Sequence, residues 1–201
     1  MSDTRRNERH AAIVAAAYDL LAEKGYAATS MLAIARRARA SNETLYRWYG
    51  NKQGLFRRMV EDNAAAAREI LTNALDTDAD TAETFQAFGP ALLRLVTGER
   101  AVALNRTAAA DLHDTGSLGQ TIAAAGRDTV LPLLSGLIGQ ALERGVLAGA
   151  PSPEIAETYV SLLIGDMQIR RAIGVLPEPD AGSIQARSER AFRQLQQLYP
   201  A

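Results

Sequence analysis

The chain has 201 residues, of which 47% are hydrophobic and 5% aromatic, and it contains no cysteine. This length and apolar content suffice for one sizeable core or two smaller ones, and a chain without cysteine has neither disulfides nor a thiolate nucleophile. No uncharged apolar run of about 18 residues occurs, and residues 1–10 lack the apolar segment of a signal peptide. We therefore expect a soluble, cytoplasmic protein without a membrane partner.

The formal net charge of -1 hides an asymmetry along the chain. Residues 1–60 carry 11 Lys+Arg and 5 Asp+Glu, giving +6, and residues 61–201 carry the other 11 and 18, giving -7. A basic end on an acidic body is typical of a protein that meets phosphate at one end only. Chance clustering of solvated charge is the alternative. Because alanine is abundant and alternating β-branched runs are few, helix is favoured almost everywhere.

The first predicted helix runs from about residue 6 to residue 24. Ile13, Ala17 and Leu20 lie on one face of it, and Gly25 is placed to end it. Tyr26 is then expected to fill the space between this helix and the next two.

Residues 29–52 predict two short helices around a tight connection. The first covers about residues 31–38 behind a cap at Ser30 or Thr29, and the second covers about residues 42–48 behind a cap at Ser41. Two helices of about two turns joined by a few residues describe a helix-turn-helix, whose second helix fits the DNA major groove. A short helical hairpin that never meets DNA is the competing interpretation.

The side chains on the second helix favour DNA. Asn42 suits adenine, Arg47 suits guanine or phosphate, and Thr44 and Tyr46 suit phosphate or a thymine methyl group. Lys52 begins the following helix, where its ammonium and the free N–H groups of the helix could bind one phosphate together.

At these residues the sequence resembles the TetR family of bacterial transcriptional repressors, over about residues 8–60. The matching positions are Ile34-Ala35, Ala38, Ser41, Thr44-Leu45-Tyr46, Lys52 and Leu55-Phe56. Arg39 stands where the family usually has glycine, and Ala40 where it has valine. Since a turn glycine usually supplies a positive φ, we predict that Arg39 is helical or left-handed, at a cost of about 1 kcal/mol, and points toward a phosphate. The full set of predicted DNA contacts is Thr29, Ser30, Arg39, Asn42, Glu43, Thr44, Tyr46, Arg47, Trp48 and Lys52.

The first three predicted helices form a head of about 50 residues. After this head, periodicity predicts further helices up to the C-terminal end, with Gly89-Pro90 expected to kink or interrupt one and Pro132 to bend another. They cover about residues 52–75, 85–96, 99–113, 117–144, 153–173 and 181–198. The predicted fold is therefore all-α with about nine helices. It divides into a helix-turn-helix DNA-binding domain, residues 1–51, and a helical ligand-binding and dimerisation domain, residues 52–201.

The helical body mixes bulky and small residues, which could leave a cavity for an apolar or amphipathic effector. The predicted lining is Phe88, Leu92, Arg106, Leu137, Tyr159, Leu163 and Met167. Burial of Arg106 would imply an anionic ligand or an internal carboxylate. The resemblance implies that the last two helices pair with a second copy, and the predicted interface is Ile155, Leu162, Ile169, Phe192 and Leu195. A deep core within one chain is the alternative for this surplus apolar surface.

No catalytic arrangement emerges from the sequence. His10 and His113 are the only histidines, and Asp111, His113 and Asp114 fit a helix end better than a metal site. We therefore predict no catalytic residue, cofactor or metal. The predicted function is a ligand-responsive repressor that binds a pseudo-palindromic double-stranded DNA operator as a homodimer and is released by a small effector. Two rivals remain: a helical small-molecule-binding protein without DNA binding, and an enzyme with clustered, strongly perturbed titratable groups in an all-helical pocket.

Overall fold

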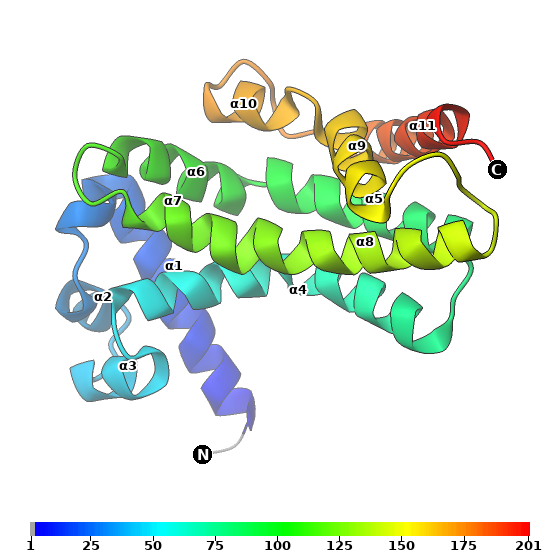
Figure 1. Ribbon diagram of the computed structural model, residues 1–201. Helices are drawn as coiled ribbons and strands as arrows, with labels where there is room; N and C mark the ends of the chain where they lie inside the picture. Colours follow the sequence, from blue (N-terminus) through cyan, green and yellow to red (C-terminus); the bar gives the residue numbers. More distant parts are fainter. Residues whose placement is uncertain (1–2) are drawn as a thin grey trace. The chain divides into compact units, whose positions relative to one another are not determined.

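The computed structural model describes residues 3–201, which form eleven α-helices and one π-helical segment and contain no β-strand (Figure 1). The all-α fold class predicted from the sequence is therefore confirmed. Two predicted helices are each divided in the structure, which accounts for the difference between about nine helices and eleven.

The first three helices are α1 (Asp3–Ala28), α2 (Met31–Arg37) and α3 (Asn42–Tyr49). Gly25 lies within α1 but has non-helical dihedral angles, φ 74° and ψ 177°. Glycine adopts such angles without steric cost, so the helical path breaks at the residue where the sequence predicted an end. Buried residues of α1, α2 and α3 then pack together in one core, to which Tyr26 contributes a side chain that is 2% exposed.

The next two helices are α4 (Lys52–Thr77) and α5 (Thr81–Thr97). Asp80 caps α5, since its Oδ1 accepts a hydrogen bond from the backbone N–H of Glu83 at 2.9 Å. Gly89-Pro90 was predicted to kink or interrupt this helix, and the interruption does not occur, because α5 continues through both residues. Both are buried, and a Cβ at Gly89 would overlap the Ser188 hydroxyl. Close packing of α5 against α11 (Ala181–Leu198) therefore outweighs the local cost of proline in a helix.

One predicted long helix corresponds to three segments: α7 (Ser117–Ile122), the π-helical η1 (Ala123–Arg127) and α8 (Asp128–Glu143). The helical geometry changes at the Ala-Ala-Ala-Gly-Arg stretch rather than at Pro132, which lies inside α8. A π turn accommodates an extra residue, and the small side chains of this stretch leave room for it. Helix α6 (Glu99–Asp111) precedes α7 in the chain and is close to its predicted bounds.

The predicted helix over residues 153–173 is likewise two helices, α9 (Ser152–Ile164) and α10 (Met167–Ala172). Gly165 separates them with φ 52° and ψ -129°, a conformation that requires glycine. The apolar pattern continues across this residue, so periodicity alone did not predict the break. The last helix, α11, is close to its predicted bounds.

The chain groups into two compact units, each made of separate stretches of sequence. The first contains residues up to Asp62 together with Ala103–Ala125, and the second contains Asn63–Val102 with Gly126–Ala201. The first unit thus includes most of α6, all of α7 and part of η1 in addition to the head. Leu104, Leu118 and Ala125 belong to the same core as the buried residues of α1–α3.

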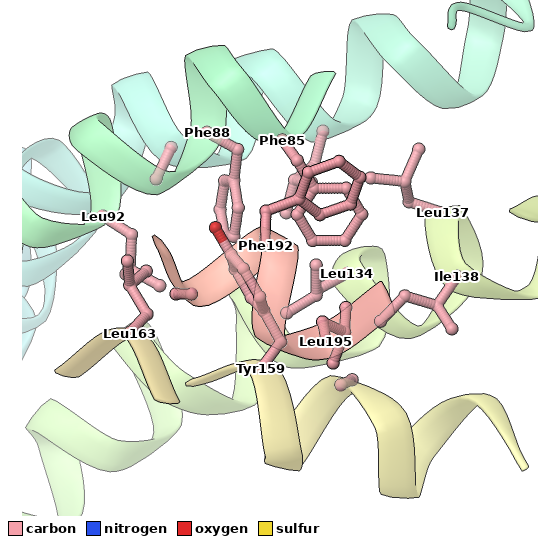
Figure 2. Packing of buried hydrophobic residues seen from close by; sticks show 14 of the residues in the cluster. Phe85, Phe88, Leu92, Leu134, Leu137, Ile138, Tyr159, Leu163, Phe192 and Leu195 are labelled. Carbon is pink, nitrogen blue, oxygen red and sulfur yellow. The ribbon is translucent and has the colours of Figure 1, made fainter. Parts of the chain in front are cut away.

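The second unit has its own core, built from α4, α5, α8, α9 and α11, and Figure 2 shows part of it. Phe85 stacks on Phe192 with ring centroids 4.6 Å apart, and Tyr159 meets Phe85 edge-on, also at 4.6 Å. Such aromatic pairs add about 0.5–1.5 kcal/mol each beyond the apolar area that they bury. The centre of this unit is therefore tightly filled.

None of the helices among residues 3–201 is sufficiently long and apolar to cross a membrane.

Candidate nucleic-acid interface

Helix α2 is fixed by a cap at one end and a buried face along its length. The Ser30 hydroxyl accepts a hydrogen bond from the Ala33 N–H at 3.2 Å, which satisfies one free donor of the first turn. Met31, Ile34 and Ala35 are buried in the core of the first unit. The opposite face is open to solvent and carries Arg36.

The turn after α2 is closed by Arg39, whose φ of 50° is left-handed. The Ala40 N–H donates to Ala35 O at 2.9 Å and the Arg39 N–H to Arg36 O at 3.3 Å, the two bonds of a Schellman motif. The left-handed conformation predicted for Arg39 is therefore confirmed. Its side chain is exposed, and its carbonyl accepts a hydrogen bond from Arg9 at 3.3 Å.

Helix α3 presents the polar face that the sequence predicted. The Ser41 hydroxyl accepts a hydrogen bond from the Thr44 N–H at 3.0 Å, and Leu45 is fully buried beneath the helix. The side chains that face solvent are those of Asn42, Glu43, Tyr46 and Arg47, and Thr44 is half-buried.

Two contacts within α3 shape this polar face. Thr44 Oγ1 lies 2.7 Å from Ser41 Oγ, and Glu43 lies 3.9 Å from Arg47 one turn later. Because Arg47 is exposed, this ion pair is weak and leaves the guanidinium available to a stronger partner.

A polar network anchors the C-terminal end of α3. His10 Nδ1 lies 2.8 Å from the Tyr49 hydroxyl and His10 Nε2 lies 2.7 Å from Asp62 Oδ2, while the Arg58 Nε–H group donates to Asp62 Oδ1 at 2.8 Å. Burial and the nearby Asp62 carboxylate raise the pKa of Tyr49 to about 12. The network joins α1, α3 and α4, so it fixes the orientation of α3 on the head.

Beside this network is a cleft of about 620 Å³ at the surface of the head. Arg6, His10, Trp48 and Arg58 lie along it, and the Arg6 guanidinium stands 5.6 Å from the centroid of the Trp48 ring. Trp48, predicted as a phosphate contact, is half-buried here with one side toward a basic cleft.

Two of the residues predicted to contact phosphate have partners within the protein. Thr29 is 1% exposed and its hydroxyl donates to Gly25 O at 2.7 Å, so its side chain cannot reach a ligand without leaving the core. The ammonium of Lys52 donates to Tyr26 O at 2.9 Å and lies 4.1 Å from the centroid of the Tyr26 ring. Lys52 therefore points inward, not toward the outside of its helix as the sequence suggested.

Positive charge is concentrated on the surface of the first unit. Arg37 is engaged by Glu23 through two hydrogen bonds of 2.7 Å. The remaining exposed arginines of the head are Arg5, Arg6, Arg9, Arg36, Arg39, Arg47, Arg57 and Arg58. This distribution places the +6 of residues 1–60 where a polyanion can reach it.

In the second unit, the predicted effector residues form core rather than a cavity. Phe88, Leu92, Leu137, Tyr159 and Leu163 are buried in one cluster, and Met167 packs at its edge. Arg106 is exposed and belongs to the first unit, so the burial that would have implied an anionic ligand or an internal carboxylate does not occur. Apolar and aromatic residues line cavities and also fill packed cores, so the sequence did not distinguish the two.

A hollow of about 400 Å³ lies instead between α4, α5 and the start of α6. Its wall includes Ala67, Ala91, Leu95 and Ala101, and Asn63, Arg94, Glu99 and Arg100 bring polar groups to it.

Glu99, on the wall of this hollow, is held by a buried arginine of α10. Arg171 donates to Glu99 Oε1 at 2.6 Å, to Thr97 O at 2.8 Å and to Leu176 O at 3.1 Å. The Arg171 side chain is 7% exposed, whereas that of Glu99 is 72% exposed. The guanidinium is therefore shielded from water on the side of Thr97 O, while the carboxylate of the ion pair faces solvent.

The five predicted interface residues fall into two groups. Ile155, Phe192 and Leu195 are buried within one chain, between 0% and 9% exposed, and therefore cannot also contact a second copy in this conformation. Leu162 is half-buried and Ile169 is 67% exposed. Ile173, one turn beyond Ile169, is also 67% exposed. Most of the surplus apolar surface in the helices predicted over residues 153–173 and 181–198 is therefore buried in the core of a single chain.

Several functional residues escaped the sequence analysis because their partners are distant in the chain. His10 was considered only as a catalytic or metal-binding residue, whereas Tyr49 and Asp62 lie 39 and 52 residues away from it. Arg171 was not singled out at all. Among residues 3–201, no group of three or more His, Asp or Glu side chains could hold a metal ion.

A basic helix-turn-helix head joined to an all-helical body defines a helix-turn-helix DNA-binding regulator. Residues 13–59 match the family model "Bacterial regulatory proteins, tetR family", and residues 83–201 match "AefR-like transcriptional repressor, C-terminal domain". The chain belongs to the TetR family of bacterial transcription regulators. Because these regulators are not enzymes, the rival interpretation as an enzyme is excluded.

Individual relatives agree with this assignment. Over 75 residues the chain is 39% identical to the HTH-type transcriptional regulator YdeS of Bacillus subtilis (strain 168), a match that covers 32% of this chain and 38% of YdeS. A TetR-family regulator of Mesorhizobium loti shares the fold with a TM-score of 0.76 at 20% identity over 100% of both chains. A TetR regulator of Agrobacterium tumefaciens is 26% identical with a TM-score of 0.72, over 95% of this chain and 94% of its own.

Proposed function

We propose that this regulator is a cytoplasmic homodimeric repressor that binds a pseudo-palindromic operator and is released from it by a small effector. The observation that carries the proposal is the solvent-facing polar and basic side of α3, held on a packed head by the network of His10, Tyr49 and Asp62. A rigid support of this kind is what base recognition requires, because a recognition helix must present its side chains at fixed positions.

The proposed base contacts come from the exposed side chains of α3. Asn42 pairs with adenine, Arg47 with guanine, and Glu43 accepts from cytosine N4, while Tyr46 and Thr44 contact a thymine methyl group or a phosphate. Ser30, Arg39 and Trp48 contact the backbone around them. Thr29 is left out because its side chain is buried.

The proposed dimer presents two α3 helices about 34–36 Å apart, so that they enter successive major grooves on one side of the DNA. Leu162, Ile169 and Ile173 form its apolar contact. Ile169 and Ile173 are both 67% exposed and are four residues apart, which puts them on one face of α10 and its end.

The proposed effector site is the hollow of about 400 Å³ between α4, α5 and α6. Its alanine and leucine wall suits an apolar group, and Arg94 beside it suits a polar or anionic one, so we expect an apolar or amphipathic molecule. An effector that prefers the DNA-incompetent state with a coupling of about 1–3 kcal/mol would weaken operator binding about 5- to 150-fold.

The deciding experiment is a titration of the purified protein with the DNA immediately upstream of its own gene, at several salt concentrations, beside unrelated DNA of equal length. We expect specific binding as a dimer and a linear fall of log K with log salt, at about 0.9 per phosphate contact. Arg47→Ala should weaken specific binding, whereas Arg193→Ala, which changes an exposed arginine of α11, should not. Equal and weak binding to both DNAs would favour the alternative of a helical small-molecule-binding protein.

A further inference from the structure

Lys52 occupies an internal site in the head although it is the first residue of α4. Its ammonium donates to Tyr26 O at 2.9 Å and faces the Tyr26 ring at 4.1 Å from the centroid. The same carbonyl accepts the Thr29 N–H at 3.1 Å. Lys52 therefore holds the connection between α1 and α2 in the conformation that positions the Ser30 cap.

Asp111, the last residue of α6, is a buried carboxyl group in the same unit as Lys52. Its side chain is 2% exposed, its Oδ2 accepts from the Thr115 hydroxyl at 2.7 Å, and its Oδ1 has no hydrogen-bond partner among residues 3–201. A buried carboxylate with an unused oxygen is costly unless a positive charge compensates it. Lys52 lies within its field, and both residues belong to the first unit.

The internal site is an imperfect one for a charged lysine. Burial is the larger effect and lowers the pKa of Lys52, while the negative charge of Asp111 opposes it. The ammonium thus gives up hydration for one carbonyl, one ring face and a carboxylate that acts without a direct bond in the structure. A phosphate oxygen at the surface offers the same group a full charge-assisted hydrogen bond with partial hydration.

We propose, on the basis of the repressor function proposed above, that Lys52 alternates between this internal site and an operator phosphate, and that Asp111 sets the balance between the two positions. In the DNA-free protein the ammonium is held by the carbonyl and the ring of Tyr26, within the field of the Asp111 carboxylate. On the operator it leaves Tyr26 and binds phosphate. Asp111 is therefore an internal competitor of the DNA for one cation.

The first test compares Asp111→Asn with wild type in operator titrations. The amide oxygen still accepts from Thr115, so only the charge is removed, and operator binding should tighten by about fivefold, the upper range for a partly exposed pair. Asp114→Asn is the matched control, because Asp114 is an exposed acid in the same turn. In a Lys52→Met background the Asp111→Asn effect should vanish. Equal effects of Asp111→Asn and Asp114→Asn, or a gain that persists in Lys52→Met, would overturn the proposal.

The second test needs no mutation, because the chain contains only two lysines, Lys24 and Lys52. With lysine labelled at the side-chain carbon and nitrogen, nuclear magnetic resonance reports both side chains separately, and exposed Lys24 is the internal reference. In the free protein the Lys52 signals should be shifted by the Tyr26 ring, and the pKa of Lys52 should lie below the ordinary value of a lysine because of burial. On adding operator DNA the ring shift should disappear and the pKa of Lys52 should rise. A ring shift that persists in the complex would overturn the proposal, even if Asp111→Asn failed to fold.

These outcomes separate the inference from the proposed function. Wild-type protein that binds its operator while Lys52 stays at Tyr26 leaves the repressor proposal intact and removes the alternation. Wild-type protein that binds no specific DNA removes both, whatever the state of Lys52.

Discussion

The turn that closes α2 allows the backbone strain at Arg39 to be measured separately from the contribution of its charge. Arg39 has φ 50° in a Schellman motif, and an L-residue in this region costs about 1–2 kcal/mol relative to a right-handed conformation. Glycine removes that cost but loses about 0.5–1 kcal/mol through the greater freedom of the unfolded chain. Arg39→Gly should therefore be more stable than Arg39→Ala by about 0.5–1 kcal/mol.

Both variants lack the arginine charge, so the comparison between them isolates the backbone. Urea unfolding followed by circular dichroism should show a midpoint about 0.2–0.5 M higher for Arg39→Gly than for Arg39→Ala, with equal slopes. Hydrogen exchange at the Ala40 amide, which donates to Ala35 O at 2.9 Å, provides a local measurement of the same turn. Equal midpoints and equal protection in the two variants would refute the strain argument.

The DNA measurement on the same two proteins tests the charge. If Arg39 binds a phosphate, both variants should bind operator more weakly, and the salt slope should be smaller by about 0.9 for each phosphate that is no longer neutralised. The weakening should be the same for glycine and alanine, because neither side chain reaches the backbone of the DNA. Wild-type slopes in both variants would remove Arg39 from the interface and leave the strain argument untouched.

Three further predictions concern the second unit. Gly89→Ala should destabilise it by about 1–3 kcal/mol in urea unfolding, since the added methyl overlaps the Ser188 hydroxyl, and Ser188→Gly should restore part of the stability. The double variant Ile169→Glu, Ile173→Glu should be a monomer in light scattering, with an unchanged melting temperature, because both side chains are exposed in the single chain. A variant that stays dimeric but melts at a lower temperature would place the interface elsewhere. Arg171→Met should lower the free energy of unfolding by about 1–3 kcal/mol because it leaves the buried Thr97 carbonyl without its hydrogen-bond donor. A wild-type unfolding midpoint would show that water replaces the guanidinium.

Local rules predicted most of the fold from the sequence. Caps such as Ser41 and Asp80 are short-range features, and both cap helices in the structure as their residue types indicate. The left-handed conformation of Arg39 was equally predictable, because a turn that normally holds glycine imposes its backbone conformation on any residue at that position. The breaks at Ala123–Arg127 and Gly165 were not readable, since apolar periodicity continues through both.

Sequence could not separate surface, core and cavity in the body. Phe192 and Ile169 have similar chemistry, yet one is 9% exposed and the other 67%. Which of them faces another helix depends on packing between segments far apart in the chain. The same limit applies to Lys52, whose position suggested a phosphate while Tyr26, 26 residues earlier, provides its acceptor.

The composition of the first unit bears on how such regulators can be recombined. Leu104 and Leu118 are 3% and 0% exposed within the same core as the head, although they lie more than 40 residues beyond Val60, the last buried residue that α4 adds to that core. A head excised at residue 51 and grafted onto another body would uncover that core. A chimera that carries residues 1–62 together with residues 103–125 keeps the core intact, so the exchangeable module of this protein is discontinuous in the gene.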